Sequence, residues 1–265
     1  MKFVSSAEKA VMKKDFGEVW NTKMARSTLI IVPIIMVVFL PIMYLIMIFF
    51  VPAEQMNGVD KMLQLLPAEA KSFTLQQSMF YIMTNLVSPM FFLMIPLMSS
   101  TVTAACSFVG EKERSTIQTL LLTPMSLKSI FKAKVLSCVS ISTISTAISF
   151  LLFTIVISVG NIMLKMPFFL NWNWLVLVLL LAPAVTVFGV IFMVLISGRS
   201  KSYMESIQTS GYIVLPVILL FVGQFTGIFQ LSALIFLVVS VGVIILDFIL
   251  WMFASHSFTT EKLLK

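Results

Sequence analysis

Charged residues divide this chain into long stretches that carry no charge at all. Between Lys71 and Glu111, and again between Lys134 and Lys165, every residue is uncharged. A helix needs about 20 apolar residues to cross the roughly 30 Å of hydrocarbon in a bilayer. Only 11% of the 265 residues are charged and 59% are hydrophobic, whereas soluble domains carry about 25% charged residues. The composition excludes a soluble enzyme, a nucleic-acid-binding domain and a disordered chain, and it predicts an all-α, polytopic integral membrane protein.

The uncharged stretches predict six transmembrane helices in a single domain that covers residues 1–265. Four stretches give one span each, and the stretch between Glu205 and Glu261 is long enough for two. Glycines and glutamines interrupt this last stretch from Gly223 to Gln230. We therefore predict spans at 27–51, 79–108, 135–160, 172–197, 211–229 and 231–254. The fifth apolar run is short, so the residues that follow it can form a re-entrant segment, which is tolerated where protein or a water-filled cavity surrounds it.

Lysines and arginines indicate which side of the membrane each connection faces. With six spans, all but three of the 18 basic residues fall on the side of the two termini; the exceptions are Lys61, Lys71 and Lys165. The positive-inside rule places this side in the cytoplasm. We expect a multi-pass protein of the cell membrane with both termini cytoplasmic. The net charge of +7 favours contact with anionic membrane lipid and requires no nucleic-acid partner.

Residues 1–26 are predicted to form an amphipathic helix before the first span. Apolar residues that include Val11, Phe16, Val19 and Trp20 recur at helical spacing, with most of the lysines outside this stripe. The pattern is typical of a helix that lies in the membrane interface, with Trp20 near the headgroups. The alternative is a solvated helix that only leads into the first span.

The connection at residues 111–131, between the second and third spans, has clear helix boundaries. Ser115 and Gln118 have the spacing of a capping box, which predicts a helix from Thr116 to Leu122. Pro124 ends this helix, and Ser126 can cap the next one. A helix of two turns cannot bury its own apolar side chains. Those side chains therefore lie either on the membrane surface or in a groove of a partner protein; they belong to Ile117, Leu120 and Leu121.

The same connection resembles the signature of type-2 ATP-binding-cassette (ABC) transporter permeases. The family pattern is approximately Glu-x-Glu-x-x-Thr-x-x-x-Leu-Leu-x-Thr-Pro-x-Ser, followed by a lysine before span three. The chain differs at Ser115, where the family often has glycine. The interfacial helix, the six spans and the cytoplasmic termini are also similar. The matching residues are Glu111, Glu113, Thr116, Leu120, Leu121, Thr123, Pro124, Ser126 and Lys134.

The resemblance implies the permease subunit of an ATP-driven exporter, which pairs with a second copy or a related permease. In this family the connection is the coupling helix, which docks on a separate ABC ATPase subunit that binds ATP and Mg. The sequence contains no Gly-x-x-x-x-Gly-Lys-Ser/Thr phosphate loop, so we expect no enzyme activity and no cofactor in this chain. We expect the two glutamates to pair with basic groups on the N-terminal helix or on the partner. The implied coupling residues are Glu111, Glu113, Thr116, Ile117, Leu120, Leu121 and Pro124.

Within the spans the candidate residues are few. In the resembling family, spans two and five line the substrate path, which points to Asn85, Tyr212, Pro216 and Phe221. Asp247 is the only ionisable residue in a predicted span, and such residues often mark functional sites. It is either the coupling charge of a secondary transporter or channel, or a structural partner of a hydroxyl or basic group. A membrane partner of an ATPase that moves no solute is a further alternative. One histidine and two cysteines offer no metal site.

Overall fold

The computed structural model describes residues 5–50, 63, 66, 72–114, 124–198, 200, 202–226 and 232–257. These residues form helices and short connections, with no strand among them. Six of the described helices are long and apolar enough to cross a membrane, which confirms the predicted all-α, six-span class. We number them spans 1 to 6: Lys23–Phe50, Leu75–Glu113, Leu127–Leu164, Trp172–Ser197, Tyr203–Gln224 and Ala233–Ala254.

Most of the spans consist of several helical segments. A separate N-terminal helix, α1 (Ser6–Asn21), precedes them. The segments are α2 (Lys23–Ile34), η1 (Ile35–Phe39) and α3 (Leu40–Phe50) in span 1; α5 (Leu75–Ile82), η4 (Met83–Val87), α6 (Ser88–Ala104), η5 (Ala105–Val109) and α7 (Gly110–Glu113) in span 2; α9 (Leu127–Leu164) in span 3; α10 (Trp172–Val176), η6 (Leu177–Leu181) and α11 (Ala182–Ser197) in span 4; α12 (Tyr203–Ser210), η7 (Gly211–Val214) and α13 (Leu215–Phe225) in span 5; and α14 (Ala233–Ser257) in span 6. The segments η1, η4, η5 and η6 are π-helical turns, and η7 is a 3-10 turn.

Prolines explain three of these π-helical turns. Pro41, Pro89 and Pro183 each lie two residues after the last residue of η1, η4 and η6. Proline has no N–H group and its ring crowds the preceding turn, so the hydrogen-bond ladder before it widens. The turn η5 has no such proline after it. It lies near the end of span 2, in the region of the candidate site.

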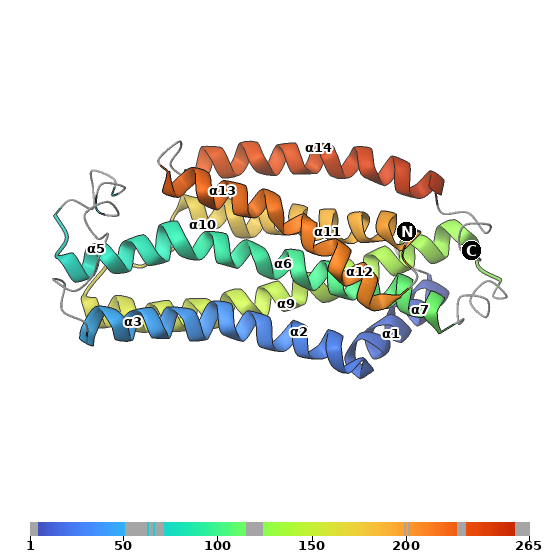
Figure 1. Ribbon diagram of the computed structural model, residues 1–265, viewed down its shortest axis with the longest axis horizontal. Coiled ribbons are helices and arrows are strands. Elements are labelled where there is room, and N and C mark those ends of the chain that lie inside the picture. Colours follow the sequence, from blue (N-terminus) through green and yellow to red (C-terminus); the bar gives the residue numbers. More distant parts are fainter. Residues whose placement is uncertain are drawn as a thin grey trace.

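The spans lie side by side along the long axis of the molecule (Figure 1). Helix α1, helix α7, the start of α12 and the last turns of α14 lie at one end of the bundle, which we call the α1 end. The last turns of α3 and the start of α5 lie at the opposite end.

Span 2 is the central helix of the bundle. In its most apolar window 89% of the residues are buried, compared with 17% for spans 1 and 6. The hydroxyls of Ser100 and Thr103 bond to carbonyls of the preceding turn, and the Thr103 hydroxyl also lies 3.0 Å from that of Ser142 on span 3. Span 4 comes close because Gly189 has no side chain: a Cβ there would collide with Ser100. This central place suits a helix rich in hydroxyls, since small and polar residues mediate close helix packing in membranes.

An aromatic cluster fills the bundle around Trp174, which is fully buried. Its closest ring is that of Phe153 on span 3, with centroids 4.9 Å apart. Phe92 of span 2 meets it edge-on at 5.7 Å. The cluster therefore joins spans 2, 3 and 4 by apolar packing, at the level where span 4 begins.

The helix of span 5 begins at Tyr203, earlier than the start expected at Gly211. Ser202 caps it, because its hydroxyl oxygen accepts a hydrogen bond from the backbone N–H of Glu205 at 3.2 Å. The charge of Glu205 had suggested a connection, but this residue lies in the exposed first turn of the helix. Of the segment Gly223–Gln230 that was expected to be re-entrant, residues 223–225 continue helix α13, and residues 227–230 lie outside the described residues.

Candidate functional site

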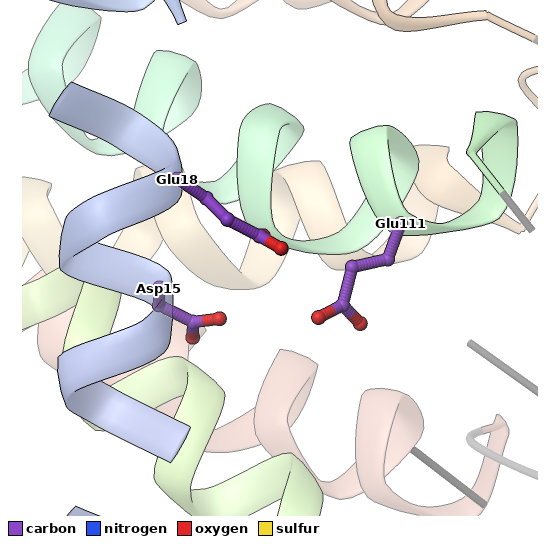
Figure 2. A group of neighbouring side chains, drawn as sticks. All are labelled: Asp15, Glu18 and Glu111. Carbon is purple, nitrogen blue, oxygen red and sulfur yellow. The ribbon is translucent and has the colours of Figure 1, made fainter. Parts of the chain in front are cut away.

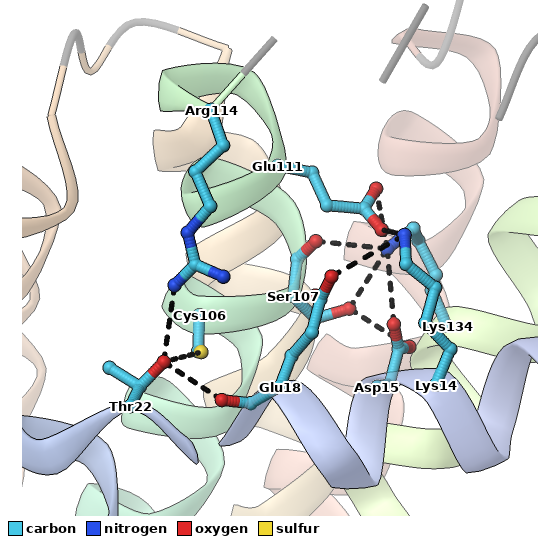
Figure 3. Close-up of polar contacts among 9 residues, drawn as sticks. All are labelled: Lys14, Asp15, Glu18, Thr22, Cys106, Ser107, Glu111, Arg114 and Lys134. Atoms are coloured by element: carbon cyan, nitrogen blue, oxygen red, sulfur yellow. Dashed lines mark hydrogen bonds and ion pairs between the residues drawn. The ribbon is translucent and has the colours of Figure 1, made fainter. Parts of the chain in front are cut away.

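Three segments that are distant in sequence meet around one buried lysine at the α1 end. Lys134 of α9 is 2% exposed. Its Nζ lies 2.8 Å from Oε2 of Glu111, in α7, and 3.4 Å from Oδ1 of Asp15, in α1. It also donates a hydrogen bond to the carbonyl oxygen of Ser107 at 2.9 Å. Figure 3 shows the ammonium group among these oxygens, so that one side chain joins α1 to spans 2 and 3.

The π-helical turn η5 brings Ser107 into this group. Its hydroxyl donates to Oδ2 of Asp15 at 3.0 Å and lies 3.1 Å from Nζ of Lys134, which donates to it. A π-helical turn shifts the backbone ladder by one residue, and such turns are frequent at functional sites. Both the carbonyl and the hydroxyl of Ser107 are thereby used in the cluster.

A second lysine binds the same glutamate from the edge of the cluster. Nζ of Lys14 lies 2.6 Å from Oε1 of Glu111 and 3.4 Å from Oε1 of Glu18. The Lys14 side chain is 40% exposed, whereas that of Glu111 is 1% exposed. Burial by itself lowers the pKa of Lys14, but the hydrogen bond and charge of Glu111, with the charge of Glu18, outweigh it and raise the pKa. Lys14 therefore stays charged, and its ammonium group neutralises part of the negative charge of Glu111 on the side of α1.

Asp15 is the member of the cluster that titrates close to neutral pH. Burial raises its pKa to about 6, and this effect exceeds the lowering by the charge of Lys134. The negative charge of Glu111 raises the pKa further. Burial of an ion pair costs several kcal/mol per ion before attraction offsets it. The attraction of Lys134 therefore offsets only part of the cost of burying the charged carboxylate of Asp15.

Three carboxylates of this region lie close enough together to suggest a cation site. Asp15, Glu18 and Glu111 each offer an oxygen, and these oxygens lie within 4.8 Å of one another (Figure 2). The ammonium groups of Lys14 and Lys134 already bind these carboxylates. A divalent cation would be repelled by two positive charges, so the group is better described as an ion-pair cluster. We call it the α1 clamp, and its residues are Lys14, Asp15, Glu18, Ser107, Glu111 and Lys134.

Helix α1 is also attached along the start of span 3. The hydroxyl of Ser129 donates to Oε1 of Glu8 at 3.0 Å, and that of Ser137 donates to the carbonyl of Met12 at 3.4 Å. Ser126 caps α9, as its position in the sequence predicts, by accepting a hydrogen bond from the N–H of Ser129 at 3.2 Å. Both stems of the connection between spans 2 and 3 are therefore bound to α1.

The apolar stripe expected along α1 is divided between two faces. Val11 and Val19 are buried together with Asp15. Phe16 and Trp20 are half exposed and stack on each other, with centroids 6.3 Å apart and rings 4° from parallel. The Asp15 carboxylate must lie on the buried face of α1 to reach its partners. This orientation of the helix turns the rings of Phe16 and Trp20 outward.

The second glutamate of the signature has a different partner from the first. Oε2 of Glu113 accepts a hydrogen bond from the backbone N–H of Tyr203, the first residue of α12, at 3.1 Å. Beside it, Nη2 of Arg114 donates to the hydroxyl oxygen of Thr22 at 3.1 Å. Glu111 pairs with a basic group of α1, as the sequence suggested. Within the described residues, Glu113 bonds to a helix N-terminus, and its expected pairing with a basic group of a partner protein stays a prediction.

Comparison with known protein families identifies the family to which this chain belongs. A family described as "ABC-2 family transporter protein" matches the chain over residues 9–237. The chain belongs to the ABC-2 transporter family. The match contains every residue of the α1 clamp and confirms the resemblance seen in the sequence, which supports a role as an ABC permease subunit. No curated protein and no solved structure gives a significant match.

The predicted coupling helix of this ABC-2 protein falls where the structure gives no description. Arg114 ends the described part of the first stem, and Pro124 begins the second. Only Glu111, Glu113 and Pro124 of the predicted coupling residues are therefore placed. The others lie outside the described residues: Thr116, Ile117, Leu120 and Leu121.

Two of the predicted path residues of the ABC-2 protein make contacts inside the protomer. The amide oxygen of Asn85 accepts a hydrogen bond from Asn171, the N-cap of span 4, at 2.7 Å, and its Nδ2 donates to the carbonyl of Tyr81. The ring of Phe221 meets that of Phe91 edge-on at 5.9 Å. These contacts tie span 2 to spans 4 and 5.

The other predicted path residues lie elsewhere. Tyr212 is 70% exposed and Pro216 is also exposed, whereas Asp247 is 7% exposed. The structure therefore does not bring the predicted path residues into one cavity of the protomer. A groove of about 250 Å³ lies between α9 and span 4, and none of them lines it.

Sequence reasoning missed Lys14, Asp15, Glu18 and Ser107 as members of the site. The signal that could have found them is Lys134, the last charge before a long uncharged run. A lysine at a helix position that becomes buried needs an anionic partner. Outside the signature, the N-terminal helix carries acidic residues on the side of the membrane where Lys134 was expected, and these were candidate partners.

Proposed function

We propose that this chain is the transmembrane permease subunit of an ATP-driven exporter. It dimerises to form the substrate path and couples to separate nucleotide-binding subunits that hold ATP and Mg. Family membership supports the permease assignment. The observation that carries the coupling assignment is the α1 clamp, because it holds both stems of the loop at 115–123 against one helix.

A loop can transmit force to two spans only if the two stems that hold it stay attached to each other. Removing one partner of a buried ion pair typically costs about 3–5 kcal/mol, so the contacts of Lys134 with Asp15 and Glu111 resist separation. The first stem, the second stem and α1 then move as one unit. A push on the loop reaches spans 2 and 3 together.

The coupling residues have distinct roles in this proposal. Ile117, Leu120 and Leu121 contact a groove of the ATPase subunit, and Thr116 and Pro124 mark the ends of the helix that carries them. Glu111 anchors the first stem. Helix α1 lies along the cytoplasmic headgroups, which suits the outward face that Phe16 and Trp20 form.

The substrate path forms between two permease copies. Tyr212 and Pro216 are exposed on span 5 of the single protomer, which suits a surface that a second copy covers. Asn85 and Phe221 lie on the inner side of the same region and hold span 2 in place beside it.

Docking on the ATPase can be tested by co-purification. Changing Leu120 and Leu121 to Asp places charges on the apolar face of the predicted coupling helix, so we expect the co-expressed ATPase subunit to be lost from the purified complex. Thr119→Asp is the matched control, because it adds charge to the opposite face of that helix, and it should retain the ATPase. Retention of the ATPase by the double variant would refute the docking assignment.

A further inference from the structure

The two glutamates of the signature point in different directions. Residues two apart on a helix are separated by about 200° and do not share a face. Accordingly Glu111 is 1% exposed and bonds to α1 and span 3, whereas Glu113 is exposed and bonds to the start of span 5. One short motif therefore makes two separate attachments, to different parts of the bundle.

The two attachments differ in how easily they can be broken. Separating Glu111 from Lys134 would leave buried charges without partners, which is strongly unfavourable. The bond from the Tyr203 N–H to Glu113 is exposed, so water can replace either partner at small cost. Glu113 also lies two residues before the loop at 115–123. Any shift of the loop therefore reaches this bond first, while Glu111 stays attached to Lys134.

The start of span 5 is built to respond to such a shift. A carboxylate at a helix N-terminus satisfies a free N–H and interacts favourably with the helix dipole. Helix α12 packs against span 2 through Tyr203 and Ile207, which contact the apolar cluster around Cys106. After eight residues α12 passes into the 3-10 turn η7, which starts at Gly211. Short 3-10 stretches within a helix often mark hinges, so α12 can move without the rest of span 5.

We propose that Glu113 is the positioning residue through which the coupling loop controls the start of span 5. It holds the first N–H of α12 in the resting protein and releases it when the ATPase moves the loop, while Glu111 keeps the stem attached to α1 and span 3. This inference rests on the proposed function, and it adds a route from the loop to the span that carries Tyr212 and Phe221.

The bond itself can be tested in the full chain in lipid nanodiscs, without an ATPase. Hydrogen exchange at residues 203–206 should become about two- to tenfold faster in Glu113→Ala, as expected for loss of a capping acceptor. Glu113→Gln keeps an acceptor oxygen and should restore part of the protection. Lys112→Gln, one residue away, should match the wild type. Unchanged exchange in Glu113→Ala would overturn the inference.

The control of span 5 can be tested in the complex with the ATPase subunit. In the wild type and in Lys112→Gln, addition of ATP should change exchange at residues 203–210. In Glu113→Ala the ATPase should still co-purify, but the change caused by ATP should be lost. A merely structural role would not remove this response to ATP. The same response in Glu113→Ala as in the wild type overturns this inference alone, whereas failure of the wild type to bind the ATPase overturns the proposed function as well.

Discussion

Asp15 shows how one buried carboxylate can make the α1 clamp sensitive to pH. It accepts hydrogen bonds from Ser107 and Lys134, and Glu111 and Glu18 also act on it electrostatically. Burial raises its pKa from 3.8 to about 6. Between these two pH values the folded protein binds more protons than the unfolded chain. The contribution of Asp15 to stability is therefore full below about pH 4 and declines as the pH rises through about 6.

This dependence can be measured by comparing the wild type with Asp15→Asn, which keeps the shape and removes the titration. The melting temperature of the wild type relative to the variant should fall between pH 4 and pH 6.5 and stay constant above. The change corresponds to up to a few kcal/mol, since one pKa unit is about 1.4 kcal/mol. Parallel pH profiles of the two proteins would contradict the assignment of this pKa.

The signature residues could be predicted from sequence more fully than their partners. The motif identified Glu111 and Lys134, because their spacing is a local property of the chain. It could not show that Asp15 joins them, since that contact depends on how α1 crosses span 3. For Glu113 the sequence predicted a basic partner on the N-terminal helix or on a partner protein, and it did not predict the backbone N–H of Tyr203 that Glu113 binds within the chain. The free backbone N–H groups at a helix N-terminus can bind a carboxylate, but the residue types in the sequence do not reveal which helix start will lie near it.

At the scale of the helices, the number and class of the spans followed from charge spacing, whereas their internal irregularities did not. The turns η1, η4 and η6 follow from the positions of prolines, but η5 has no such mark in the sequence. Likewise hydropathy assigned Phe16 and Trp20 to the same stripe as Val11 and Val19. A lipid-facing surface and a protein-facing surface are both apolar, so periodicity alone could not separate them.

The contact between spans 2 and 4 gives a prediction at this scale. Gly189→Ala places a methyl group against Ser100, so we expect a loss of about 1–3 kcal/mol, as for overpacking elsewhere. Ser100→Ala in the same chain removes the hydroxyl and should recover part of the loss. Gly242→Ala is the control, because no atom lies within 4 Å of the added Cβ. Thermal unfolding in detergent would measure the three variants, and equal effects at the two glycines would contradict the close packing.

At the scale of the whole molecule, the role of Asp247 distinguishes an ATP-driven permease from an ion-coupled carrier. It is 7% exposed, and its Oδ1 has no hydrogen-bond partner among the described residues. The expected structural partner is therefore not found in the part of the chain that the structure describes. Family membership favours ATP as the energy source, and a carrier would need several polar groups near the midplane.

The distinction can be tested with the chain alone in vesicles that contain a pH-sensitive dye. After an imposed pH gradient, the wild type and Asp247→Asn should dissipate it at the same rate as each other. In the complex with the ATPase, the variant should hydrolyse ATP within about twofold of the wild type, because the clamp's ion pairs do not involve Asp247. Proton movement that the wild type catalyses and the variant lacks would favour the carrier.

The α1 clamp also determines which parts of such a protein can be exchanged between relatives. Residues 115–123 lie between two anchored stems in the sequence, so this segment can be grafted as a unit without changing the ion pairs of the stems. The N-terminal helix has no such freedom, because Asp15 must meet the lysine of span 3. Under the proposed function, the segment that binds the ATPase can be exchanged as a module, while the first helix and the membrane bundle are inherited together.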